Sequence, residues 1–229
     1  MSAWAILAAA GEGSRLGGGP KAFVPLAGAP MIAHSLMSLA KAPSIDAIVI
    51  AAPDGFQDEA RSVAASTIPS ARVEVVPGGA TRQESVRNAL AAVPDHVYSV
   101  VVHDAARPLV TVELVEAALG GLELEMAAIV AIPERDTLKR ERDGRVLETV
   151  SRAGLWRAQT PQAFRTGPLR RAHDRALADL FEGTDDAALL ERIGIDIAIV
   201  SGDDLNLKVT TPGDLAVAEA LLVAAQRGM

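Results

Sequence analysis

The chain has 229 residues, of which 49% are hydrophobic and only 3% aromatic, with a formal net charge of -7 and no cysteine. This length fits one large α/β domain, which we prefer, or two small ones, with a core of small aliphatic side chains. The acidic balance argues against nucleic-acid binding, and the lack of cysteine excludes disulfides and thiolate metal sites. The first residues, Met1-Ser2-Ala3-Trp4, carry no charged n-region, and no apolar run approaches the roughly 18 residues of a membrane span. We therefore expect a cytoplasmic protein that binds no membrane.

An apolar run, Trp4-Ala5-Ile6-Leu7, leads into a glycine-rich segment at 8–21 that bears two cations, Arg15 and Lys21. This pattern predicts a first strand and a loop whose backbone N–H groups face an anion such as the phosphates of a nucleotide. The loop lacks the Gly-Lys-Ser/Thr of a P-loop, and its third glycine, Gly17, falls one place late for the dinucleotide fingerprint. A flexible surface loop with incidental charges is the alternative interpretation.

Hydrophobic periodicity then predicts strands and helices in alternation, which is typical of an α/β fold. Expected strands cover 4–7, 45–52, 72–76, 97–102, 126–132 and 196–200, with a short one at 205–209; expected helices cover 31–40, 57–66, 112–122, 168–180 and 187–193. Two further helices have recognisable starts. Thr81 and Glu84 have the spacing of a capping box, and Thr211-Pro212 supplies an N-cap and a first-turn proline.

The segment 133–158 interrupts this alternation. It is charged and contains the turn signal Asp143-Gly144, which favours an extended hairpin arm that projects from the sheet. An arm that cannot bury itself usually packs on a partner. We therefore expect a homodimer that forms through this arm.

The strand expected at 97–102 ends in His103-Asp104-Ala105-Ala106-Arg107-Pro108. Because open α/β sheets bind ligands at the carboxyl ends of their strands, the charged residues here are candidate site residues. We interpret His103 as a packed strand-end residue rather than as an acid or base. Asp185 and Asp186 fit carboxylates that stabilise the start of a helix.

Five stretches gain meaning when they are taken together. They are Ala-Ala-Gly-x-Gly-x-Arg with Pro20-Lys21, Gly78-Gly79 with Arg82 and Ser85, His103 to Pro108, Gln159-Thr160-Pro161-Gln162, and Asn206-Leu207-Lys208-Val209-Thr210. In this order they strongly resemble the 2-C-methyl-D-erythritol 4-phosphate cytidylyltransferases of the non-mevalonate isoprenoid pathway, from about Ala5 to Leu222. The resemblance implies a Rossmann-like, mostly parallel sheet flanked by helices, in a single nucleotidyltransferase domain at 1–229 with 133–158 as a protruding dimerisation arm.

The reaction that the resemblance implies joins CTP and methylerythritol phosphate to give 4-diphosphocytidyl-2-C-methyl-D-erythritol and pyrophosphate. The phosphate monoester that attacks the α-phosphate is already an anion, so no general base is required and catalysis rests on positioning and charge neutralisation. The resemblance also implies a Mg²⁺ ion, held mainly by the CTP phosphates and water, with Asp104 as the nearest candidate protein ligand.

The resemblance further assigns roles to individual residues. Catalytic charges are expected from Arg15, Lys21 and Lys208. Nucleotide contacts are expected from Ala9, Ala10, Gly11, Gly13, Gly79, Ala80 and Ser85. Contacts to methylerythritol phosphate are expected from Asp104, Arg107, Thr137, Arg152 and Thr160, with Arg152 acting in the active site of the neighbouring subunit.

Alternatives stay open at this point. Ribitol 5-phosphate cytidylyltransferases share nearly all these motifs, although Ala106 and Gly154-Leu155-Trp156 look more like the methylerythritol enzymes. A non-catalytic CTP-binding module is a second alternative, against which the three retained cations speak. Arg107 also fits a structural partner of Asp104, and Thr160 fits a hydroxyl that stabilises a turn.

Overall fold

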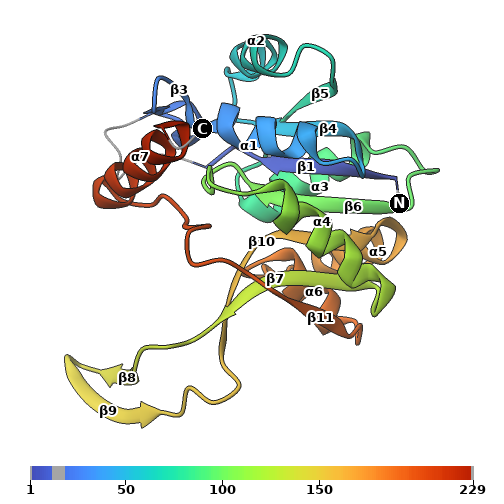
Figure 1. Cartoon of the computed structure of the whole chain (residues 1–229). Helices are drawn as coiled ribbons and strands as arrows, with labels where there is room; N and C mark the ends of the chain where they lie inside the picture. The colour runs from blue at the N-terminus through green and yellow to red at the C-terminus, as the bar shows by residue number, and fades with distance from the viewer. Residues whose placement is uncertain (1, 12–18, 228–229) are drawn as a thin grey trace.

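Strand β1 (Ala3–Ala8) lies in the middle of a seven-stranded sheet with the order β11-β7-β10-β6-β1-β4-β5 (Figure 1). The computed structural model of the chain describes residues 2–11 and 19–227. The other strands of this sheet are β4 (Ile45–Ala52), β5 (Arg72–Pro77), β6 (Ser99–Asp104), β7 (Ala127–Pro133), β10 (Trp156–Arg165) and β11 (Ile197–Ser201). Strand β10 is antiparallel to both of its neighbours, and the remaining neighbours pair in parallel. The expected α/β fold with a mostly parallel sheet is confirmed.

Helices cover both faces of the sheet. They are α1 (Met31–Lys41), α2 (Gln57–Thr67), α3 (Arg82–Ala92), α4 (Val112–Gly120), α5 (Thr166–Ala178), α6 (Asp186–Arg192) and α7 (Pro212–Arg227), with short 3-10 turns at Lys21–Phe23 and Gly121–Glu123. Each expected helix is confirmed, with ends that shift by one or two residues. Within the described part of the chain, the helices are too short or too polar to cross a bilayer.

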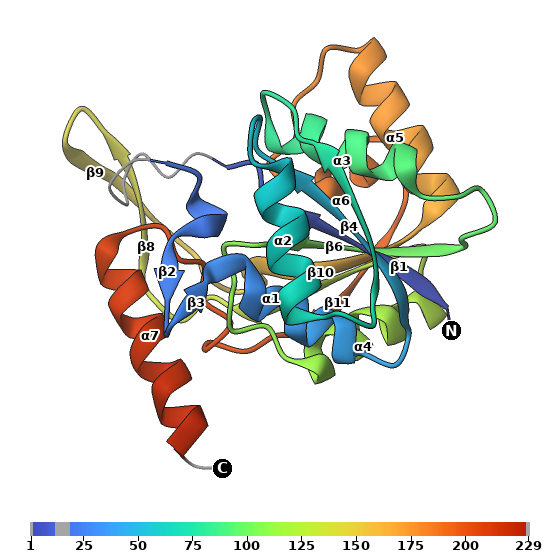
Figure 2. The same cartoon turned by 90° about the horizontal axis from the view of Figure 1, so that it is seen from above.

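Alternation along β1 explains the two layers of helices. Ala5 and Leu7 point into one core with α1, α2 and α4, whereas Trp4 and Ile6 point into a second core with α3, α5 and α6. Figure 2 shows α1 and α4 on one side of the sheet and α3 and α5 on the other. Successive side chains of a strand face opposite sides of the sheet, so a strand buried on both faces must be apolar throughout. This is why β1, β4 and β6 could be predicted from sequence.

Strand β10 is the element that the sequence analysis missed. The stretch around Gln159 and Gln162 was interpreted as a turn after the arm, but it forms the antiparallel strand between β6 and β7. Pairing is irregular between Ala158 and Gln162, which is where the proline lies. Gln159, Thr160 and Gln162 are buried because each finds polar partners elsewhere in the fold. No apolar pattern marks such a strand.

The segment at 205–209 was expected to form a short strand, and this expectation is wrong. Its polar groups bind the loop that follows β6 instead of a neighbouring strand: the N–H of Val209 donates to the carbonyl of Ala106 at 2.8 Å, and the carbonyl of Asn206 accepts from Arg107 at 2.7 Å. The segment therefore crosses the carboxyl edge of the sheet on its way to α7.

A third, small core fastens this crossing segment. Val209 and Ala218 of α7 pack with Leu26 and Met31, which follow Lys21 in the chain. Leu26 belongs to β2 (Pro25–Leu26), which pairs with β3 (Ala29–Pro30). The two segments that carry Lys21 and Lys208 are thus held by one apolar cluster.

The arm is present as a hairpin of β8 (Leu138–Arg142) and β9 (Arg145–Val150). Figures 1 and 2 show it standing away from the sheet. Two of its apolar side chains are exposed, with 65% of Val146 and 50% of Leu147 accessible to solvent. The prediction of a hairpin arm within 133–158 is confirmed, although its last residues already belong to β10.

Replacing Leu26 by alanine is expected to lower the free energy of unfolding by about 2–5 kcal/mol, because Leu26 is 1% exposed in the third core. Leu124→Ala, at a leucine that is 75% exposed, is the matched control and is expected to change it by less than about 0.5 kcal/mol. Chemical denaturation at one protein concentration measures both. Equal effects of the two variants would contradict the third core.

Candidate active site

A cavity of about 1150 Å³ opens at the carboxyl ends of β1, β4, β5 and β6. It is lined by residues from several parts of the chain, within 8–11, 19–22, 53–54, 78–85 and 104–106, together with Lys208. The chain adds β4 and β5 on one side of β1 and then returns to place β6 on the other side. Open α/β sheets bind ligands at such a switch point, because the loops diverge there and leave a crevice.

Two glycines bring the loops of this cavity into close contact. A Cβ on Gly78 would lie 2.3 Å from the Cβ of Ala10, and one on Gly79 would lie 2.1 Å from the Cγ of Glu84. The hydroxyl of Ser85 fixes the same loop, since it accepts from the N–H of Gly79 at 3.0 Å and donates to the carbonyl of Thr81 at 2.9 Å. The predicted nucleotide residues Ala9, Ala10, Gly11, Gly79, Ala80 and Ser85 all line the cavity.

The capping box at the start of α3 is half formed. The hydroxyl of Thr81 accepts from the N–H of Glu84 at 3.1 Å, as predicted. The carboxylate of Glu84 does not return to Thr81 but accepts from the N–H of Ala80 at 2.8 Å. Glu84 thereby braces the glycine turn that lines the cavity.

Of the two cations in the glycine-rich segment, the structure describes Lys21 but not Arg15. The N–H of Lys21 donates to the carbonyl of Gly11 at 3.3 Å, so the two ends of the glycine-rich segment meet, and Lys21 lines the cavity. The predicted catalytic residue Arg15 and the predicted nucleotide residue Gly13 lie outside the described residues.

Asp104, at the end of β6, accepts from one cation on each of its carboxylate oxygens. Nε of Arg82 lies 2.8 Å from Oδ1, and Nζ of Lys208 lies 2.7 Å from Oδ2. Burial disfavours the charged form of Asp104, but the charges and hydrogen bonds of these two cations outweigh it and hold its pKa well below the usual range. Asp104 is therefore an anion throughout the physiological pH range.

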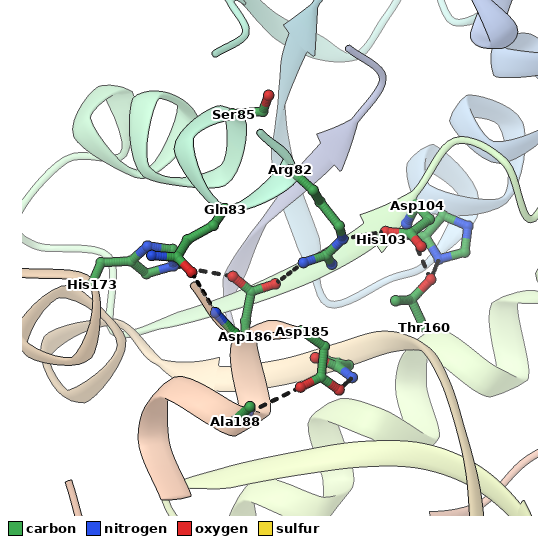
Figure 3. A network of polar contacts seen from close by, with 12 residues as sticks. Arg82, Gln83, Ser85, His103, Asp104, Thr160, His173, Asp185, Asp186 and Ala188 are labelled. Atoms are coloured by element: carbon green, nitrogen blue, oxygen red, sulfur yellow. Dashed lines mark hydrogen bonds and ion pairs between the residues drawn. The ribbon is translucent and has the colours of Figure 1, made fainter. Parts of the chain in front are cut away.

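Behind Arg82 lies a second buried carboxylate, that of Asp186 (Figure 3). Nη1 of Arg82 donates to its Oδ2 at 2.7 Å, and Nε2 of His173 donates to its Oδ1 at 3.0 Å. Burial would lower the pKa of Arg82, but the charges of Asp186 and Asp104 raise it above the usual value. Arg82 is thus clamped between two buried acids.

His103 is neutral and has no free ring nitrogen. The hydroxyl of Thr160 accepts from the N–H of Asp104 at 3.0 Å, so its proton is donated to Nδ1 of His103, also at 3.0 Å. The single ring proton of the neutral His103 is therefore on Nε2, which donates to the carbonyl of Arg107 at 3.2 Å. Burial lowers the pKa of His103 from 6.5 to about 4. This confirms the interpretation of His103 as a packed strand-end residue.

Arg107 fastens backbone in this structure. Its guanidinium donates to the carbonyl of Asn206 at 2.7 Å and to that of Ala158 at 3.3 Å. The amide of Asn206 in turn donates to the carbonyl of Thr160 at 2.9 Å and to Gln159 at 3.2 Å. These bonds tie the segment that carries Lys208 to β10 and to the loop after β6.

A carboxylate cage for a metal is not present among residues 2–11 and 19–227, where no group of three or more suitable side chains gathers. Asp104 lines the cavity together with Lys21 and Lys208, and the other carboxylates of the lining are Asp54 and Glu84. Such a donor set fits an ion whose ligands are mostly phosphate oxygens and water, with at most one or two carboxylates.

The family model for 2-C-methyl-D-erythritol 4-phosphate cytidylyltransferase matches residues 3–224 of the chain. The chain belongs to this family. It is 44% identical to the enzyme of that name from Salinibacter ruber over 94% of this chain and 91% of the relative. It is 45% identical to the one from Deinococcus radiodurans, over 95% and 88%.

Solved structures agree with this membership. The structure of 2-C-methyl-D-erythritol 4-phosphate cytidylyltransferase from Thermus thermophilus matches with a TM-score of 0.81 and 33% identity, over 96% of this chain and 98% of that one. The structure of 4-diphosphocytidyl-2C-methyl-D-erythritol synthase from Anaerococcus prevotii matches with a TM-score of 0.86 and 28% identity, over 96% of each chain.

Two residues that the cytidylyltransferase resemblance assigned to the substrate lie on the arm. Thr137 and Arg152 are exposed and do not line the cavity among the described residues. Arg152 donates to the carbonyl of Arg135 at the base of the arm. Within one protomer, these two residues therefore lie apart from Asp104 and Lys208.

Sequence reasoning missed the central role of Arg82 and the buried position of Asp186 in this cytidylyltransferase. Arg82 was noted as part of a motif but given no role, and Asp186 was interpreted as a helix-start carboxylate. The adjacent Asp185 is the residue that caps α6, with Oδ1 accepting from the N–H of Ala188 at 2.9 Å. Two consecutive acids at a helix start carry no signal that tells which one is buried.

We expect the free energy of unfolding to fall as the pH drops from about 6.5 towards 4, because unfolded His103 takes up a proton in this window and folded His103 does not. A depressed folded-state pKa in a histidine gives stability that is complete above the unfolded pKa, and here it amounts to roughly 3 kcal/mol. Asp104 and Asp186 lose their contribution only at lower pH, since their folded pKa values lie below the usual carboxyl range.

Denaturation curves recorded at several pH values and one protein concentration measure how steeply the free energy of unfolding changes with pH. His103→Asn, which keeps an acceptor for Thr160, is expected to flatten the slope between pH 6.5 and 4. His96→Asn at an exposed position is the control. A slope that survives in His103→Asn would contradict a neutral, buried His103.

Proposed function

We propose that this chain transfers the cytidylyl group of CTP to 2-C-methyl-D-erythritol 4-phosphate, giving 4-diphosphocytidyl-2-C-methyl-D-erythritol and pyrophosphate. Membership in the family over nearly the whole chain supports this reaction. The structural observation that carries it is the cavity at the switch point, which sets the glycine loops and Lys21 beside Asp104 and Lys208. One cavity thus offers backbone N–H donors, cations and a carboxylate, that of Asp104, which can accept hydrogen bonds from the hydroxyls of a polyol.

The chemistry needs these groups and no base. An oxygen of the phosphate monoester attacks the α-phosphorus in line, a new P–O bond forms, and the bond to the bridging oxygen breaks as pyrophosphate leaves. The nucleophile is already an anion, so catalysis consists of alignment and of charge neutralisation on the phosphates. Lys21, Lys208 and Arg15 supply that charge. His103 fits no role in proton transfer, because both its ring nitrogens are in use.

The remaining contacts follow from the positions of the residues. The cytosine and ribose lie against residues 9–11 and 79–85, and the carboxylate of Asp104 accepts from hydroxyls of the methylerythritol. Asp104 would hold Mg²⁺ together with phosphate oxygens and water, and the ion would neutralise charge on the phosphates. Arg107 and Thr160 act on the substrate by holding Lys208 and Asp104 in place.

The arm completes the site from a second copy of the chain. Residues 1–229 form one nucleotidyltransferase domain, and the exposed apolar side chains of 133–158 cover the partner in a homodimer. Arg152 and Thr137, which lie away from the cavity of their own protomer, then reach the substrate phosphate in the partner's site. An isolated protomer has an incomplete substrate site.

The first test is formation of the product from CTP, Mg²⁺ and methylerythritol phosphate, with ribitol 5-phosphate as the competing substrate. Turnover with methylerythritol phosphate alone is expected, and Lys21→Ala is expected to lower kcat on the order of 10²–10³-fold through loss of transition-state charge stabilisation. Lys41→Ala at an exposed helix end is the control. Preference for ribitol 5-phosphate would instead identify a ribitol 5-phosphate cytidylyltransferase. No product with either substrate would favour a non-catalytic CTP-binding module.

The second test mixes two impaired variants, Lys21→Ala and Arg152→Ala. If Arg152 acts across the dimer, one site of each heterodimer is intact, so equal amounts mixed under subunit exchange are expected to recover about a quarter of wild-type activity. The exchange is monitored by the mass of a tagged subunit. No recovery despite exchange would place the action of Arg152 within its own protomer.

A further inference from the structure

Asp186 is the first residue of α6, and its carboxylate is not used at the start of that helix. Asp185 caps the helix, whereas both oxygens of Asp186 face side chains from other elements, Arg82 on α3 and His173 on α5 (Figure 3). The side chains of Asp186 and His173 are each 1% exposed. Burying a carboxylate this deeply is costly unless it is paired, so its geometry is set by these two partners.

The two cations on Asp104 differ in how firmly they are held. Arg82 binds a buried carboxylate at each end of its guanidinium, and 27% of its side chain is exposed. Lys208 makes one ion pair, with Asp104, and 42% of its side chain is exposed. A lysine is also a point charge on a flexible stem, whereas the planar guanidinium of arginine is fixed by two-sided pairing. Lys208 is therefore the cation that can leave Asp104.

We propose that Asp186 is a positioning residue for the cytidylyl transfer, which holds Arg82 on Asp104 so that Lys208 exchanges Asp104 for a substrate phosphate. The proposal rests on the proposed function. His173 supports it from behind, because its Nε2–H fixes the other oxygen of Asp186. The site thereby keeps one cation in place and releases the other.

Loss of the Asp186 charge changes both cations. Nη1 of Arg82 loses its charged acceptor and keeps at most a neutral amide oxygen. Nη2 already has no partner among the described residues, so the guanidinium turns towards the phosphates in the cavity that Arg82 lines. Asp104 then keeps Lys208. Bound pyrophosphate thus gains Arg82 as a partner, while the transition state of the transfer step loses Lys208. Tighter binding of ground states of this kind does not raise kcat.

The experiment compares Asp186→Asn with Asp185→Asn, the neighbouring acid whose carboxylate accepts from Gln162 and Ala188. Product formation gives kcat, and titration calorimetry gives the affinity for inorganic pyrophosphate with Mg²⁺. Asp186→Asn is expected to lower kcat about tenfold or more and to tighten pyrophosphate binding severalfold, while Asp185→Asn changes neither by more than about twofold. A purely structural role of Asp186 does not tighten pyrophosphate binding.

A double-variant cycle tests whether Asp186 acts through Arg82. The double variant Arg82→Gln/Asp186→Asn is expected to lose no more kcat than Arg82→Gln alone, because the second change removes a partner that is already without its cation. Losses that add, or a pyrophosphate affinity that falls with kcat, would overturn the proposal. So would a kcat of Asp186→Asn within about twofold of the wild type.

His173 gives a second route if Asp186→Asn does not fold. His173→Leu removes the donor to Asp186 and is expected to shift kcat and pyrophosphate affinity in the same directions, and His173→Gln, which keeps a donor, is expected to restore both. Equal behaviour of the two variants would overturn the proposal. A wild-type chain without turnover would defeat the proposed function instead, while the calorimetric comparison would still test the hold on Arg82.

Discussion

A carboxylate that is buried at the end of a strand must be balanced by cations, and Asp104 imposes this requirement on the rest of the site. Arg82 satisfies one oxygen from the start of α3, and Lys208 satisfies the other from the crossing segment before α7. Both cations come from segments far from β6 in sequence. The glycine turn, the third apolar core and the hydrogen bonds of Arg107 to backbone carbonyls therefore hold these segments at the same carboxyl edge of the sheet.

Most of the sheet could be predicted because its strands are buried on both faces and separated by amphipathic helices. Strand β10 could not, because its buried centre contains Gln159, Thr160 and Gln162, and each of these forms a hydrogen bond with a residue more than twenty positions away. The segment at 205–209 misled in the opposite way. Its alternation of Leu207, Lys208 and Val209 is that of a strand, yet its apolar residues face the third core and its lysine faces Asp104.

The candidate site divides along the same line. Residues in glycine-rich and strand-end motifs could be predicted to line a cavity, and Ala9, Gly79, Asp104 and Lys208 are among the described ones that do so. Arg107 lies beside them but uses its hydrogen bonds on backbone carbonyls. The sequence could not distinguish the roles of Asp185 and Asp186. Their spacing predicts the start of a helix, but it does not predict which distant side chain each carboxylate contacts.

The distribution of charge also suggests why the site needs acids at all when its substrates are anions. Lys21, Lys208 and Arg82 alone would form a cavity that binds polyphosphate tightly in every state, including the pyrophosphate product, and such uniform binding does not accelerate the chemical step. In the exchange that we propose, Asp104 and Asp186 withhold part of that charge until a phosphate competes for it. Because Arg82 is held from two sides and Lys208 from one, the competition is decided at Lys208, at the carboxyl end of β6 where Asp104 stands.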